Sequence, residues 1–240
     1  MTYRDMDDVI SSLLNPEDAP YPSEILLRRV KSAILEDLRP IRPLAPVRIL
    51  FVGCAIVFLS VVAVGALVLG MNGWGTLSLV QRIVMFLTLA ASAVLLANSM
   101  IRQMVPGSRH ILAPAVLLVS ILILLMMVIA ATFRSQPEST FLAAGVMCLK
   151  NGLTFSMPAG LLLWFILRRG AILYPKLMGA VAGGFAGLAG LSVLEFNCPN
   201  LNVFHILVWH AGVVIVGSFG GALLGAAVES IEQWRKHIRP

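Results

Sequence analysis

Long apolar runs separated by short polar segments dominate the chain from residue 47 onward. A helix needs about 20 apolar residues to cross the hydrocarbon core of a bilayer, within a range of roughly 17–25. Six runs meet that length, and each is bounded by charges, prolines or polar clusters. The pattern predicts an all-α polytopic membrane protein with spans at 47–70, 81–101, 111–133, 151–168, 177–195 and 205–228.

Residues 1–46 are the only sizeable segment outside the predicted spans, and 229–240 form a short polar tail. The helical period predicts two short amphipathic helices, at 5–14 and 23–38, followed by a stiff proline-rich connector. Their apolar faces suit either an interfacial helix resting on the membrane or a docking segment that enters a partner's groove. The stripe of the second helix consists of Ile25, Leu26, Leu27, Val30, Ile34, Leu35 and Leu38.

The composition agrees with a membrane protein. Of the 240 residues, 58% are hydrophobic and 12% are charged, with a mean hydropathy of +0.90. A soluble domain carries about 25% charged residues, so this chain has too few to cover a water-facing surface. Three cysteines are too few for a disulfide-dense scaffold.

The distribution of basic residues predicts the orientation. Of the 18 Lys and Arg residues, 15 lie in segments that an even number of spans places on the same side as both termini. The positive-inside rule then predicts cytoplasmic termini, in a bacterium at the inner membrane, and outward loops near 71–80, 134–150 and 196–204. The net charge of +6 therefore indicates orientation and not nucleic-acid binding. The three basic residues of the outward side are Arg82, Arg134 and Lys150.

Glycines recur at four-residue spacing along one face of each of the last two spans. Such faces let two helix backbones approach closely, and this helix packing is our interpretation. The alternative is a substrate path cleared by small residues. The six glycines are Gly179, Gly183 and Gly187 in the fifth span, and Gly217, Gly221 and Gly225 in the sixth.

Two cysteines lie at the outer ends of spans. Cys54 falls inside the first span and suits a small buried apolar residue, whereas Cys148 and Cys198 fall in separate outward loops. Three interpretations stay open for this pair: a structural disulfide, a sensor of oxidant or thiophilic metal, and two unrelated thiols. Lys150 lies two residues from Cys148, and a nearby cation increases the reactivity of a thiol.

His205 and His210 begin the sixth span, close in depth to Cys198. Five residues along an α-helix correspond to a rotation of about 140°, so we do not expect both to bind one metal ion. His205 joining the two cysteines is the weaker metal hypothesis, and a hydrogen-bonded histidine is the simpler one. Glu195 is placed to pair with either histidine or with Lys150.

Catalytic motifs are missing from the sequence. It contains no HExxH, GxSxG or Walker loop, and no cluster of carboxylates within the spans. We therefore expect no enzyme, no catalytic residue and no resident cofactor, with transient binding of a thiophilic heavy metal as the exception. A small six-span transporter or permease-like protein is the alternative function.

Several short motifs resemble a known family. The chain resembles the NrsF-like negative regulators of sigma F, which are six-span membrane anti-sigma factors of an extracytoplasmic-function (ECF) sigma factor. The resemblance covers roughly residues 28–228. It rests on the connector Asp37 to Pro46, Cys148, Pro158, the turn Leu167-Arg168-Arg169-Gly170-Ala171, the glycine-rich fifth span, Asn197-Cys198-Pro199 and Trp209.

The resemblance implies a function and a partner. It implies that the amino-terminal segment binds an ECF sigma factor, and that Cys148 and Cys198 sense oxidant or heavy-metal stress. The expected partners are this sigma factor and the lipid bilayer, with no direct binding of nucleic acid. By position, the implied partner-binding residues are Leu26, Leu27, Val30, Ile34, Leu35, Leu38, Arg39 and Arg42.

Overall fold

The computed structural model describes residues 28, 31–32, 45–105, 112–136, 139–168, 170 and 172–238. The chain divides into two compact units, Met1–Pro43 and Leu44–Pro240. In the first unit Arg28, Lys31 and Ser32 are helical, within the helix predicted at 23–38. The helix predicted at 5–14 lies outside the described residues, as do Leu26, Leu27, Val30, Ile34, Leu35, Leu38, Arg39 and Arg42.

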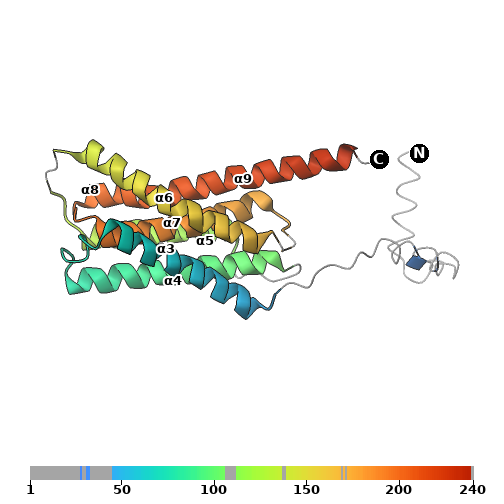
Figure 1. Cartoon of the computed structure of the whole chain (residues 1–240), viewed down its shortest axis with the longest axis horizontal. Coiled ribbons are helices and arrows are strands. Elements are labelled where there is room, and N and C mark those ends of the chain that lie inside the picture. Colours follow the sequence, from blue (N-terminus) through green and yellow to red (C-terminus); the bar gives the residue numbers. More distant parts are fainter. Residues whose placement is uncertain are drawn as a thin grey trace, which may run out of the picture. The chain divides into compact units, whose positions relative to one another are not determined.

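The described part of the second unit is a helical bundle (Figure 1). Among the described residues, six helices are long and apolar enough to cross a membrane, the sixth running through three consecutive segments, which confirms the predicted fold class. The segments are α3 (Val47–Leu69), α4 (Leu79–Met104), α5 (Pro114–Thr132), α6 (Phe141–Leu167), α7 (Pro175–Asn197), α8 (Val203–His205), the π-helical turn η1 (Ile206–His210) and α9 (Ala211–Ile238).

The fourth span begins earlier than the sequence indicated. We predicted it from residue 151, but α6 starts at Phe141 and is 27 residues long. The run 141–150 is apolar apart from Lys150 and continues the helix, and Gly145 is buried directly against the Trp209 indole. Cys148 therefore lies within a helix and not in a loop.

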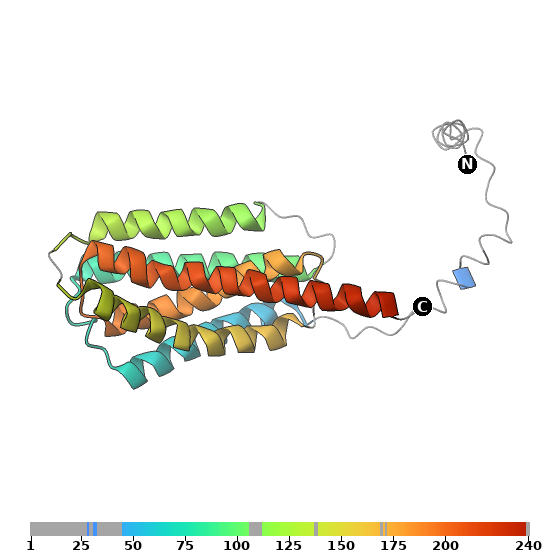
Figure 2. The same ribbon diagram turned by 90° about the horizontal axis from the view of Figure 1, so that it is seen from above.

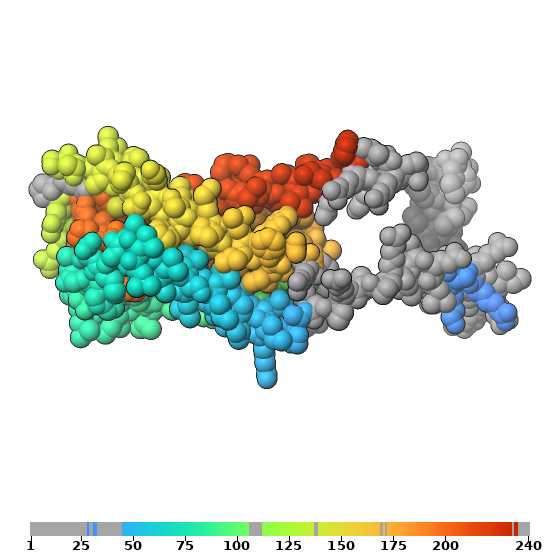
Figure 3. All heavy atoms as spheres, in the orientation of Figure 1, coloured from blue at the N-terminus to red at the C-terminus, as the bar shows by residue number. Residues whose placement is uncertain are grey.

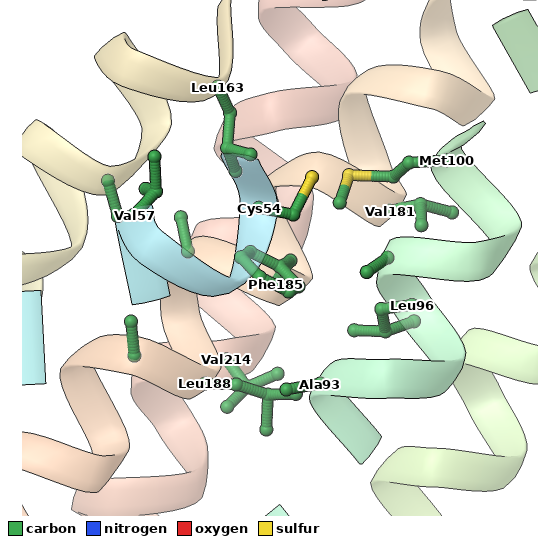
Figure 4. Close-up of a cluster of buried hydrophobic side chains, with 14 of the residues drawn as sticks. Cys54, Val57, Ala93, Leu96, Met100, Leu163, Val181, Phe185, Leu188 and Val214 are labelled. Carbon is green, nitrogen blue, oxygen red and sulfur yellow. The ribbon is translucent and has the colours of Figure 1, made fainter. Parts of the chain in front are cut away.

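Helix α7 is the centre of the bundle. Its apolar window is 72% buried, against 22–28% for the other five spans. It contacts α3, α4, α5, α6 and α9, and α3 and α6 cover one face of the assembly (Figure 3). Figure 4 shows Phe185 and Leu188 of α7 among side chains from the surrounding helices, with Cys54 of α3 beside them. Cys54 is only 1% exposed and belongs to this core.

Helices α7 and α9 are in backbone-to-backbone contact, and α9 then continues past the other helices toward the carboxyl terminus (Figure 2). The contact depends on glycine because the space for a Cβ atom is already filled by the opposite backbone. At Gly183, for example, an added Cβ would meet the carbonyl group of Gly217. The six glycines at this contact are Gly179, Gly183, Gly187, Gly217, Gly221 and Gly225.

Candidate functional site

Four side chains with metal-ligating chemistry gather at one end of the bundle. This end, at which α7 finishes and α8 begins, is called the cysteine end below. Cys148 comes from α6, Cys198 directly follows α7, His205 ends α8 and His210 ends η1. One ligand atom from each of the four lies within 4.8 Å of those of the others. We refer to these four residues as the Cys2His2 cluster.

The π-helical turn brings the two histidines together. In η1 the backbone N–H of Ala211 bonds to the carbonyl of Ile206, five residues back, where an α-helix would use the fourth. Residues five apart in a π turn therefore share a face. The rings of His205 and His210 are 5.5 Å apart between centroids. The expectation that the two lie too far apart around the helix for one metal ion is wrong, because it assumed α-helical spacing throughout.

The two cysteines of the cluster are thiols in contact. The Sγ of Cys148 lies 3.5 Å from the Sγ of Cys198, and Cys198 Sγ lies 3.8 Å from Nε2 of His205. The hydrogen bond from the Cys148 thiol, together with the rings of His205 and His210, lowers the pKa of the Cys198 thiol well below its ordinary value, although burial opposes the shift. The Cys198 thiol is therefore arranged for chemistry that uses a thiolate, with the Cys148 thiol in contact with it.

Glu195 orients His210. The Oε1 atom of Glu195 lies 2.9 Å from Nδ1 of His210, and both side chains are at least 97% buried. Nε2 of His210, on the opposite side of the ring, has no hydrogen-bond partner among the residues that the structure describes. Lys150 is exposed, and two residues along α6 place it about 200° around the helix from Cys148. Glu195 thus pairs with His210 and leaves the other ring nitrogen directed at the cluster.

The backbone around Cys198 is held by the loop that joins α3 to α4. Gly73 packs so closely on Cys198 that an added Cβ would lie 2.9 Å from its carbonyl carbon. Gly73 and Trp74 donate backbone hydrogen bonds to the carbonyl oxygens of Asn197 and Phe196, at 3.1 Å each. The Trp74 ring also stacks on Phe196, with 5.3 Å between centroids. The end of α7 is therefore positioned by a loop more than 120 residues earlier in the chain.

Asn202 holds the entry to α8. Its side-chain oxygen accepts a hydrogen bond from the N–H of Phe204, as a helix N-cap does, and its amide group donates to the carbonyl of Gln136 at 2.7 Å. The N–H of Val203 bonds to the carbonyl of Arg134. These bonds attach the segment that carries His205 to the chain that follows α5.

Comparison with protein families identifies the chain. Residues 35–228 match the NrsF family, described as "Negative regulator of sigma F". The chain belongs to the NrsF family. The match covers α3 to η1 completely and α9 as far as residue 228, so it includes the Cys2His2 cluster and Glu195; it begins at Leu35, near the end of the helix predicted at 23–38. Searches of curated proteins and of solved structures returned no significant match.

The sequence of this NrsF chain indicated three members of the cluster and missed the fourth. Cys148, Cys198 and His205 were candidates, and the structure brings their ligand atoms together. His210 was not expected to share a metal ion with His205, because α-helical spacing separates the two by about 140°. Nothing in the run Ile206 to Trp209 distinguishes a π turn from an α-helix. The sequence left Glu195 open to pair with either histidine or with Lys150, and the structure shows the pair with His210.

Proposed function

We propose that this protein is a membrane-embedded anti-sigma factor of the bacterial inner membrane. In this proposal residues 1–46 bind an ECF sigma factor and withhold it from RNA polymerase, and Cys148 and Cys198 respond to oxidant or heavy-metal stress. The observation that carries the proposal is the family match, because it joins negative regulation of a sigma factor to a bundle of six membrane-spanning helices.

The charge distribution supports the orientation that this function needs. With 15 of 18 Lys and Arg residues on the side of the termini, the positive-inside rule places residues 1–46 in the cytoplasm. A sigma factor is met only there. The cysteine end then faces the periplasm, an oxidising compartment in which neighbouring thiols are open to chemical change.

The arrangement of the helices offers a route for the signal. Cys148 belongs to α6, whereas Cys198 lies in the connection from α7 to α8. A bond or a shared metal ion between them would fix α6 relative to that connection. Helix α9 starts directly after His210 and continues without interruption to Ile238, in close contact with α7 along its glycine face. A displacement at the cysteine end is thereby transmitted by one rigid helix.

Binding of the sigma factor is tested with the full chain in lipid nanodiscs and ECF sigma factors made separately. We expect one of them to be captured, and failure of all to bind would overturn the proposal. Paired substitutions locate the contact. The double variant Leu35→Asp/Leu38→Asp lies within the family match, whereas Leu26→Asp/Leu27→Asp lies before it. Loss of binding in the first pair alone would assign the contact to the end of the predicted helix 23–38, within the family match.

The sensing role is tested by a reporter for the captured sigma factor. We expect the double variant Cys148→Ser/Cys198→Ser to abolish or lock the response to peroxide and to cadmium. The matched control is Cys54→Ser, because Cys54 is buried in the core at α3 and not at the cysteine end. An unchanged response in the double variant would reduce the pair to a structural role.

A further inference from the structure

We propose that Cys148, Cys198, His205 and His210 are the four ligands of a tetrahedral Zn²⁺ centre, with Glu195 as the positioning residue of His210. The inference deepens the proposed sensing function, since it names the ligand set and the ion. The metal centre does not depend on binding of a sigma factor, because the four ligand atoms and the buried carboxylate are features of the bundle itself.

The spacing of the ligand atoms fits a tetrahedral centre. With Zn–S near 2.3 Å and Zn–N near 2.0–2.1 Å, the edges of a ZnS2N2 tetrahedron are about 3.8 Å for S···S, 3.5 Å for S···N and 3.3 Å for N···N. The two sulfur atoms are 3.5 Å apart, and Cys198 Sγ is 3.8 Å from His205 Nε2. All four ligand atoms lie within 4.8 Å of one another, so the widest pair needs to close by no more than about 1.5 Å.

The unpartnered nitrogen of His210 is a second observation, beside the spacing of the ligand atoms, that supports a metal centre. His210 is 1% exposed, and its Nε2 lacks a hydrogen-bond partner within the described part of the chain. Leaving a buried polar atom unsatisfied costs about 1–3 kcal/mol. In the neutral imidazole, the Nδ1–H of His210 donates to the Glu195 carboxylate, and Nε2 then carries the lone pair that a metal ion needs. A carboxylate behind a ligating histidine is the usual outer partner of a zinc site.

Charge favours a divalent ion over a monovalent one. Two thiolates and two neutral imidazoles balance the charge of Zn²⁺, whereas Cu⁺ would leave a net negative charge beside the carboxylate of Glu195. Three of the four ligand residues are at least 91% buried, and Glu195 is 3% exposed. An uncompensated charge is costly in such surroundings. Two sulfur and two nitrogen ligands in a tetrahedron are also the donor set of closed zinc sites.

The centre joins three parts of the chain. Its ligands come from α6, from the residue after α7, and from the α8–η1 segment. The π turn is required because it alone places both histidines on one face. Zn²⁺ bound here holds the start of α6 against the start of the last span, and it occupies both thiolates, so the disulfide and the metal-bound state exclude each other.

The binding test uses the purified full chain in nanodiscs, reduced, freed of metal and carrying no polyhistidine tag. Zn²⁺ is titrated against a chromophoric chelator, and Co²⁺ serves as the spectroscopic probe. We expect one ion per chain, and for Co²⁺ the intense visible bands of a tetrahedral site with thiolate-to-metal charge transfer. Substoichiometric binding, or the weak bands of octahedral Co²⁺, would overturn the proposal even without any variant.

Three variants assign the ligands. His205→Ala and His210→Ala should each weaken Zn²⁺ binding by about 100-fold or more, and Glu195→Gln by about 10–100-fold with the tetrahedral Co²⁺ spectrum retained. The retained spectrum separates a positioning residue from a ligand. Cys54→Ala is the matched control and should bind as the unchanged chain does. Wild-type affinity in His210→Ala would overturn the four-ligand centre.

The outcomes also separate this inference from the proposed function. The same nanodisc preparation is used for capture of the sigma factor. Capture without stoichiometric Zn²⁺ overturns the metal centre and leaves the anti-sigma proposal intact. Zn²⁺ binding without capture of any sigma factor overturns the anti-sigma proposal and leaves the metal centre intact.

Discussion

A methyl group added to the α7–α9 contact should separate the two helices. In Gly221→Ala the new Cβ would lie 2.9 Å from the carbonyl carbon of Gly179 and 3.1 Å from the Cα of Gly183. Both neighbours are backbone atoms and cannot rotate away. The carbonyl oxygen of Gly179 would lie closer still, so reaching an ordinary contact of about 3.4 Å requires α9 to move by more than about 1 Å.

The cost follows from how helices associate in lipid. A gap of about 0.5–1 Å removes a quarter to a half of the dispersion attraction between the facing atoms. Packing is the main force available, because lipid tails are as apolar as the helix surfaces. We therefore expect the free energy of unfolding to fall by about 1–3 kcal/mol, as in overpacked cores. For a chain of this length, that lowers the Tm by about 2–12 °C.

The neighbouring glycine provides the control. A Cβ added at Gly220 meets no atom within 4 Å, so Gly220→Ala has the helix-propensity gain without the clash. Thermal unfolding of both variants in the same detergent should give a lower Tm for Gly221→Ala and an unchanged or higher Tm for Gly220→Ala. Equal Tm values for the two variants would refute the reasoning that backbone contact holds α7 to α9.

Three further predictions concern the loops and the core. Ser78→Ala removes a capping-box side chain at the start of α4 and should lower the free energy of unfolding by about 1 kcal/mol, measured by thermal melting. Gly73→Ala should displace Cys198 and slow diamide-induced disulfide formation in the cluster, whereas Gly75→Ala, with open space around its Cβ, should not; equal rates would contradict the role of this loop. In the folded, metal-free protein, Cys54 should resist maleimide while the partly exposed Cys148 reacts, as mass spectrometry would show, and equal labelling of the two would contradict the burial of Cys54.

Most of the fold could be predicted from the sequence because bilayer thickness imposes one length on every span. The prediction placed the start of α6 ten residues too late because it began the span after Lys150, although the run 141–149 before that residue is itself apolar. The meeting of His205 with His210 could not be predicted. A periodicity argument assumes the same rotation per residue, about 100°, along the whole helix. The π turn η1 has a smaller rotation per residue, and nothing in its apolar sequence marks it. The pairing of Glu195 with a histidine was one of the pairings that the sequence allowed, but its burial, which requires a partner, is seen only in the structure.

The central position of α7 has a consequence for the order of assembly. It is the fifth of six spans in the chain, yet it is the helix around which the others pack. During synthesis the first four spans enter the bilayer before the helix that they surround. Until α7 and the following span arrive, they have only their limited contacts with one another. The native bundle therefore forms late in biogenesis, and a nascent chain interrupted after α6 would present quality-control proteases with unassembled helices.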